Sequence, residues 1–274
     1  MSAIRVGPTR TKVTAGRRVD AELRQIAQES GIDYFRARTN LREVFGKQVS
    51  WGFLTHGSVL ASIGLVLSPV IESLRIPSTH LIGTDIAWGS HPSLDPLWST
   101  DRLTVIHDGA DASRVEKTRR VADEPLAQEH LRVCFMQFRR LNCSRCVKCM
   151  RTMATLTFLN RLDAFPTFRG PVDLDRLQAK ELRTPNDVIQ MKDVLALGAT
   201  VAGHDDLKDA IQSMLTAYQD KLTAKQDKRS TSVRISSVSP LSWREGIGPQ
   251  RGPKGSFQLV NAAHRTRQHA VVPS

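Results

Sequence analysis

The feature that most restricts what this chain can fold into is the placement of its cysteines. All four cysteines of the 274 residues fall within sixteen positions, in the pattern Cys134-x8-Cys143-x2-Cys146-x2-Cys149. A tetrahedral zinc ion needs four thiolates about 2.3 Å from one centre, and a short Cys-x2-Cys turn can direct two sulfurs inward. The spacing therefore predicts that these four side chains converge on one metal ion.

Other chemistries fit the same spacing. Iron–sulfur clusters also take four thiolates, and closely spaced cysteines can be redox-active. Thiols arranged in this way in a reducing compartment are more often metal ligands than disulfides. We favour zinc, and because all four ligands would come from the protein, the ion has no open coordination position and its expected role is structural.

The composition is that of an ordinary globular chain. Hydrophobic residues make up 40%, charged residues 24% and aromatic residues only 5%, which excludes collagen-like and wholly disordered chains. No apolar run reaches the roughly 20 residues needed to cross a bilayer, and Met1–Lys12 lacks the apolar segment of a secretory signal. We therefore expect a cytoplasmic protein with no membrane partner.

The net charge of +12 is unevenly distributed along the chain. Residues 224–274 carry nine Lys or Arg against Asp227 and Glu245, a net charge of +7. Because this stretch is rich in Ser, Gly and Pro and shows no apolar period, residues 223–274 are predicted to form a basic disordered tail. The tail is either a solvated extension or an arm that contacts RNA or a protein partner.

Strand and helix patterns alternate in the first half of the chain. We expect a flexible N-terminus over 1–16, an α/β domain over 17–133, and a region over 134–222 that combines the cysteine cluster with helices. Strands are predicted at 32–38, 80–83 and 103–107, and helices at 16–30, ending before Gly31, at 53–74, and after the capping box Ser113-Arg-Val-Glu116. This alternation predicts a parallel sheet covered by helices, with ligand-binding groups at the carboxyl ends of the strands. Helices are also expected over 171–221, one beginning at Pro185 after Thr184 and ending at Gly198.

Polar residues follow the predicted strands and occupy the loop at 89–99. The candidate ligand-binding residues are Thr39, Asn40, Thr84, Asp85, Ser90, His91 and Asp95. Each can instead cap a turn, as Ser, Thr, Asn and Asp often do. His107 and Asp108 at the end of the third strand carry the same two interpretations, and His56 within an apolar helix is typical of a hydrogen-bonded core histidine. In the basic helix after Ser113, Arg114 or Lys117 could meet a phosphate or lie on a solvated face.

The cysteine pattern, followed by Met150-Arg151-Thr152-Met153, resembles the zinc motif of the 7-cyano-7-deazaguanine synthase family, within the PP-loop ATP-pyrophosphatase superfamily. Weaker matches are Thr39-Asn40, His56-Gly57, Gly83-Thr84-Asp85, the loop at 89–99 and the basic helix 113–120. The resemblance covers roughly residues 17–165. It implies a Rossmann-like α/β fold and a reaction in which ATP, with magnesium, adenylates a small carboxylate or a nucleobase-like substrate.

One part of the family pattern is missing from the 274 residues. In the family, a Ser-Gly-Gly-x-Asp-Ser loop after the first strand holds the ATP phosphates, and here the nearest stretches are Ala15-Gly16-Arg17 and Gly31-Ile32. We therefore expect a parallel sheet that is incomplete at its N-terminal side and a truncated or degenerate family member. A truncated reading frame, a split enzyme completed by a partner chain that supplies the loop, and a paralogue that only binds substrate all remain open. The alternative function is a zinc-stapled module that binds RNA or a protein without catalysis.

Overall fold

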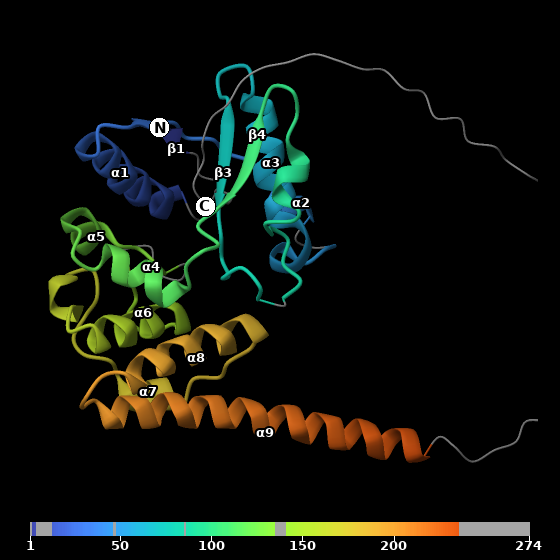
Figure 1. Ribbon diagram of the computed structural model, residues 1–274, viewed down its shortest axis with the longest axis vertical. Coiled ribbons are helices and arrows are strands. Elements are labelled where there is room, and N and C mark those ends of the chain that lie inside the picture. Colours follow the sequence, from blue (N-terminus) through green and yellow to red (C-terminus); the bar gives the residue numbers. More distant parts are fainter. Residues whose placement is uncertain (1, 4–12, 46–47, 85, 135–140, 236–274) are drawn as a thin grey trace, which may run out of the picture.

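The computed structural model describes residues 2–3, 13–45, 48–84, 86–134 and 141–235 (Figure 1). Within this part of the chain the protein is mixed α/β, with helices predominating. Its strands form two parallel pairs, β1 (Ser2–Ala3) with β2 (Asp33–Tyr34) and β3 (Ser73–Pro77) with β4 (Thr104–Asp108). The expected α/β class and the parallel pairing of strands are confirmed. The strands described form two separate pairs and not one larger sheet.

The β3–β4 pair has a small core of its own. Leu74 and Ile76 of β3 pack with Leu103 and Val105, and all four are buried. Helix α3 (His56–Leu67) packs against β3 and contributes Ala61 to this core. Because the register pairs the last residues of both strands, their carboxyl ends lie at the same edge (Figure 1), and this edge carries the polar pocket described below.

The helix predicted over 53–74 is wrong in its second half. The segment instead forms a single π-helical turn (Trp51–Thr55), then α3, and finally β3, which takes the place of the end of the predicted helix. Pro69, which has no backbone N–H, follows directly after the C-cap of α3. Beyond it, burial alternates from Leu74 to Pro77 with the two-residue period of a strand. The strand predicted at 80–83 is also wrong, since these residues form turns after β3, with Gly83 at a φ of 82°.

Several predicted helix ends are confirmed. Helix α1 (Val13–Glu29) ends before Gly31, whose φ is 64°, the left-handed conformation that glycine adopts at a helix end. Helix α4 (Arg114–Val121) begins at a capping box in which the Glu116 N–H donates to the Ser113 hydroxyl and the Ser113 N–H donates to the Glu116 carboxylate. Helix α8 (Pro185–Ala199) begins at a second capping box, between Thr184 and Asp187.

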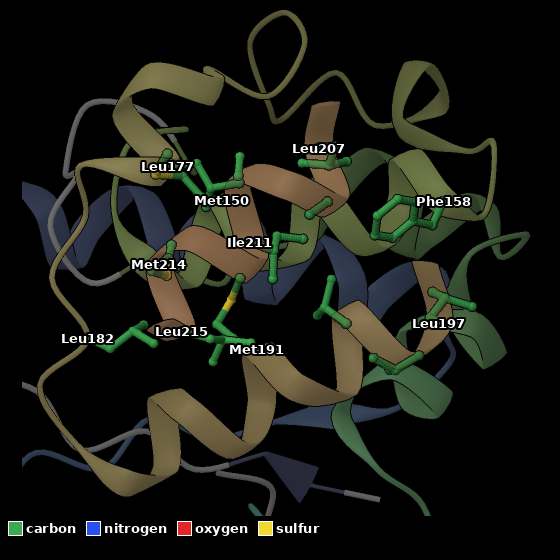
Figure 2. Close-up of a cluster of buried hydrophobic side chains, with 14 residues drawn as sticks. Met150, Phe158, Leu177, Leu182, Met191, Leu197, Leu207, Ile211, Met214 and Leu215 are labelled. Carbon is green, nitrogen blue, oxygen red and sulfur yellow. The ribbon is translucent and has the colours of Figure 1, made fainter. Parts of the chain in front are cut away.

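The larger core lies among the C-terminal helices. The remaining helices are α2 (Leu41–Phe45), α5 (Pro125–His130), α6 (Val147–Phe158), α7 (Leu174–Gln178) and α9 (Asp205–Ile235), with 3-10 turns at Asp95–Trp98 and Leu162–Ala164. Figure 2 shows side chains of α6, α7, α8 and α9 meeting in one apolar cluster, which includes Met150, Phe158, Leu177, Met191 and Ile211. This cluster holds α6, and with it two of the cysteines, in a fixed place.

The two ends of the chain differ from the expected segment boundaries. Helix α1 begins at Val13, so the last part of the segment 1–16 is helical. Helix α9 continues to Ile235, so the first part of the predicted tail 223–274 is helical as well. The stretches 4–12 and 236–274 lie outside the described residues. Among the helices described, none has the length and apolar character needed to cross a membrane.

Gly198 lies inside α8, so its predicted position at the helix end is wrong. The helix ends at Ala199, and Thr200 is the C-cap. A methyl group on Gly198 would lie 2.7 Å from Cζ of Phe158, which is shorter than a van der Waals contact. The glycine therefore allows α8 to approach α6 closely.

Gly198→Ala is expected to destabilise the protein by about 1–3 kcal/mol, because overpacking outweighs the gain of roughly 1 kcal/mol in helix propensity. Urea unfolding measures the loss. Phe158→Leu should remove the clash, so in the double variant we expect a coupling of at least about 0.5 kcal/mol. Strict additivity of the two substitutions would contradict the contact.

Candidate metal centre and polar pocket

The four cysteines meet at one point beside α6. All four sulfur atoms lie within 4.8 Å of one another. The Cys146 sulfur lies 3.5 Å from that of Cys149 and 3.9 Å from that of Cys134, and the sulfurs of Cys143 and Cys149 are 3.8 Å apart. A tetrahedron with metal–sulfur bonds of 2.3 Å has sulfur–sulfur separations of about 3.8 Å. The cluster predicted from the sequence can therefore hold a metal ion.

The backbone around the Cys143–Cys146 turn is shaped to present sulfur atoms. Ser144 adopts a positive φ of 55°, and the N–H groups of Arg145 and Cys146 donate to the Cys143 sulfur at 3.4 and 3.3 Å. Cys146 is the N-cap of α6 and Cys149 lies in its first turn. Backbone N–H groups at a helix N-terminus favour negative charge, so this position favours thiolates.

The thiols differ in their readiness to ionise. Hydrogen bonding from the Cys149 thiol lowers the pKa of Cys146 to about 5. The same hydrogen bond, together with burial, raises the pKa of Cys149, and burial raises that of Cys143. Cys146 therefore ionises first, and a bound cation displaces protons from the other thiols, which makes metal affinity fall as the pH falls.

Asn142 fixes the segments that carry the cysteines. Its side chain is buried, accepts from the Val133 N–H at 2.9 Å, and donates to the Leu131 carbonyl at 2.7 Å and to the Thr167 hydroxyl at 3.1 Å. These bonds tie the residues before Cys134 to the turn at Cys143. Asn142 was not among the predicted site residues, because its role depends on partners that are distant in sequence.

Apolar and cationic groups complete the surroundings of the cysteines. The aromatic rings of Phe165 and Phe168 and the side chain of Met153 pack with Cys134 and Cys149 in one buried cluster. The positive charge of Arg132 acts on the sulfurs of these two cysteines. A zinc ion with four thiolates carries a net charge of −2, so the nearby guanidinium would offset part of it.

A second site lies at the carboxyl ends of β3 and β4, where Asp95 is the centre of a buried hydrogen-bond network. Asp95 is fully buried. Its Oδ2 accepts from the Ser90 hydroxyl at 2.6 Å and from Nδ1 of His107 at 2.7 Å, and its Oδ1 accepts from the His91 N–H at 3.3 Å. The network fixes the loop 89–99 against the end of β4.

A pocket opens beside this network. It is lined by Ser78, His80, Leu81, Ile82, Thr84, Ile86, Ser90, His91, Pro92 and His107. The enclosed space is about 10 Å³, which is roughly what one water molecule needs. The pocket therefore admits one small polar group, as the protruding end of a larger ligand would provide.

The structure brings together four of the candidate ligand-binding residues predicted from the sequence. Thr84, Ser90 and His91 line the pocket, and Asp95 lies behind it. His107, which carried two interpretations, belongs to the same site, whereas Asp108 forms an ion pair with Arg75 at 3.4 Å. Asp85 lies outside the described residues.

Thr39 and Asn40 are placed elsewhere. The Thr39 hydroxyl accepts from the Leu41 N–H at 3.1 Å, and the Asn40 carbonyl accepts from the N–H groups of Glu43 and Val44. The Thr39 side chain caps the start of α2, Asn40 contributes only its backbone carbonyl, and neither residue is among those that line the pocket. For Thr39 the turn-capping interpretation is the one that the contacts support.

Ser78 and His80 were missed as site residues, because His80 fell within the wrongly predicted strand at 80–83. Burial lowers the pKa of His80 to about 4, and the charges of Arg114 and Lys117 act in the same direction. Nε2 of His80 is buried without a hydrogen-bond partner in the described part of the chain. The sequence signal was a Ser-x-His triplet directly after a short buried strand.

His56 agrees with its interpretation as a core histidine. Its Nδ1 lies 3.2 Å from the Trp51 carbonyl, and its ring packs edge-on against Trp88. Burial lowers its pKa. The ring is therefore neutral at pH 7, with Nδ1–H donating to the carbonyl.

The Asp95 network determines which proton chemistry is open to this site. With Nδ1–H of His107 donating to a carboxylate, a neutral ring keeps Nε2 as an acceptor. The Ser90 hydroxyl donates to Asp95, whereas in a nucleophile triad it would donate to Nε2 of the histidine. The arrangement thus suits hydrogen bonding or proton exchange by His107 better than attack by Ser90.

Comparison of the sequence with protein-family models, curated proteins and solved structures gave no match.

Proposed function

We propose that this chain is a zinc-stabilised α/β protein that binds a small polar ligand at the carboxyl edge of β3 and β4. The observation that carries the proposal is the convergence of Ser90, Asp95 and His107 in one buried network beside a pocket at that edge. Ligands of parallel α/β proteins commonly bind at the carboxyl ends of the strands. A buried carboxylate that holds a histidine in one tautomer is a costly feature for a surface without a ligand.

Zinc is the metal that we propose for the cysteine cluster. Four thiolates at tetrahedral separations suit a single ion of this kind. An iron–sulfur cluster places several iron atoms between its cysteine ligands and needs more room than these sulfurs leave. All four cysteines are free thiols, which supports our placement of the protein in the reducing cytoplasm.

We further propose a relation to the PP-loop ATP pyrophosphatases with a Rossmann-like sheet. The cysteine motif, the parallel β3–β4 pair and the capped helix α4 after β4 support this relation. In that family ATP and magnesium activate a small carboxylate or a nucleobase-like substrate. Those two compound classes are therefore our candidates for the ligand.

The isolated 274-residue chain is expected to bind ATP only weakly, with a Kd near or above about 1 mM, and to release no pyrophosphate. It contains no Ser-Gly-Gly-x-Asp-Ser loop, and individual hydrogen bonds of about 1 kcal/mol do not replace a phosphate cradle. Calorimetric titration with ATP and magnesium and a pyrophosphate-release assay measure both properties. Micromolar binding would contradict the expectation.

The ligand site can be tested through its histidine rings. Guanine or succinate, as probes of the two compound classes, should shift the imidazole NMR signals of His107 and His80. His204, an exposed residue whose ring packs edge-on against Phe158 of the larger core, serves as the internal control. His107→Gln should remove the binding, and shifts that spare His107 and His80 for both probes would contradict the proposed site.

RNA binding is the second candidate function. Residues 224–274 contribute +7 to the net charge of +12, and clustered Lys and Arg bind phosphate backbones in a salt-dependent way. A mobility-shift assay with single-stranded RNA tests it on the full chain and on a chain ending at Ile235. Binding that depends on the removed residues and weakens steeply with salt would favour this candidate.

A further inference from the structure

Two arginines, the partly buried Arg114 and the buried Arg151, lie on the neighbouring helices α4 and α6. Arg114 is the first residue of α4, and Arg151 lies two residues after Cys149 on α6; the two helices pack against each other (Figure 1). Arg151 is only 6% exposed. The Nε atoms of both arginines are buried and have no hydrogen-bond partner in the described part of the chain.

The neighbouring acidic groups do not pair with these guanidinium groups. Among the described residues, no carboxylate forms an ion pair with Arg114 or Arg151. The charges of Asp187, Cys146 and Asp193 reach Arg151, but neither carboxylate forms an ion pair with it, and that of Asp187 already accepts from the Thr184 hydroxyl and N–H. Glu116 accepts from the Ser113 N–H.

Other cations also lie near these guanidinium groups. Arg114 and Arg151 are close enough for their charges to act on each other. The charges of both arginines also act on Lys148. Lys117 of α4 donates to the Ser78 carbonyl at 2.9 Å, which connects this cationic group to the edge of the polar pocket.

A buried cation without a direct ion-pair partner is unfavourable, because buried charges in proteins are normally paired. We propose that Arg114 and Arg151 form a binding site for an oxyanion group, a phosphate or a carboxylate, between α4 and α6. A guanidinium group presents parallel N–H donors that match two oxygens of either anion. The charge of Arg114 also reaches His80, so the anion would be the charged end of the ligand held at β3 and β4; this last step rests on the proposed function.

The test uses the full, metal-loaded chain and simple anions as probes. Thermal midpoints are measured in potassium phosphate, in succinate and in chloride at equal ionic strength. Phosphate also stabilises proteins without binding to a site, so the informative quantity is the difference between variants. One of the two oxyanions should raise the thermal midpoint of the wild type more than it raises that of Arg151→Met. The anion with the larger effect shows whether the site prefers a phosphate or a carboxylate.

Two outcomes separate an anion site from a structural role of Arg151. Removing an unpaired buried charge should leave Arg151→Met at least as stable as the wild type in chloride, while its affinity for the anion falls roughly tenfold or more. Arg114→Met should lose affinity in the same way. Arg119→Met, which changes an exposed arginine on the same helix, should behave like the wild type.

The proposal is overturned if Arg151→Met and Arg114→Met keep the anion response of the wild type. It is also overturned if neither anion stabilises the wild type more than it stabilises these variants. His107→Gln should retain the response to inorganic phosphate, because the arginine pair does not need the polar pocket to bind it. Failure of the anion site can therefore be told apart from failure of the proposed ligand pocket.

Discussion

Replacing Cys149 with serine is expected to abolish metal binding and to unfold much of the protein at room temperature. Structural zinc sites contribute on the order of 10–16 kcal/mol of binding free energy, which is available only to the folded chain. Whole domains are stable by only about 5–15 kcal/mol. Cys149 is fully buried in the first turn of α6, so the loss of this ligand affects the helix that the larger core packs around.

Circular dichroism during heating, combined with metal analysis, measures this effect. Thr152→Ser is the matched control, because Thr152 is buried on the same helix and its hydroxyl donates to the Lys148 carbonyl, a bond that serine keeps. The control should bind metal normally and lose about 1 kcal/mol or less, as expected for one buried methyl group. A Cys149→Ser protein with the melting temperature of the wild type would contradict a structural metal.

Asp95→Asn is expected to destabilise the protein by about 2–4 kcal/mol. The carboxylate accepts three hydrogen bonds, from Ser90, His91 and His107, while fully buried. An amide has one oxygen and turns its NH2 group toward a donor, so at least one buried donor loses its partner. The loss of one hydrogen bond from a buried network lowers the free energy of unfolding more than the loss of an exposed hydrogen bond does.

Urea unfolding gives the free-energy difference. Asp101→Asn is the control, because Asp101 is exposed in the same region, and it should change the stability by no more than about 0.5 kcal/mol. The imidazole signal of His107 should also change in Asp95→Asn, because its Nδ1–H loses a charged acceptor. A stability loss equal to that of Asp101→Asn would show that the buried network contributes little.

The cysteine cluster could be predicted because its geometry is local. Three of the ligands lie within seven residues, Cys143–Cys149, so the turn and the start of α6 fix their relative positions. The capping box at Ser113 and the helix start at Thr184-Pro185 were predicted for the same reason, since each depends on residues at most three positions apart.

The β3 strand could not be predicted, because its apolar residues also continue the spacing of the preceding helix. Leu74 fits the three- to four-residue pattern of α3 and also the alternation of a strand, and short apolar runs leave the two periods unresolved. The error moved the strand end, and so Ser78 and His80 were overlooked. Ser90, His91 and Asp95 were still found, because Pro and polar residues mark their loop independently of the strands.

The sequence analysis named Arg114 as a possible phosphate contact, but its pairing with Arg151 could not be predicted, for a different reason. A run of Arg and Lys on a helix usually indicates a solvated face, and nothing in the sequence shows that α4 packs on α6. Arg151 is buried by tertiary contacts with residues that are distant in the chain. Only the packed structure shows that the Nε atoms of both arginines are buried without hydrogen-bond partners in the part that it describes.

The structural zinc site is most directly tested by X-ray absorption at the zinc edge, with the metal content of the purified full chain measured in parallel. The account predicts one zinc ion per chain, with four sulfur neighbours at about 2.3 Å, and the loss of that signal in Cys149→Ser. Iron in place of zinc would leave the four-cysteine site as proposed and change only the identity of the metal. A purified, folded chain without stoichiometric metal, or a metal with oxygen neighbours instead of sulfur, would contradict it.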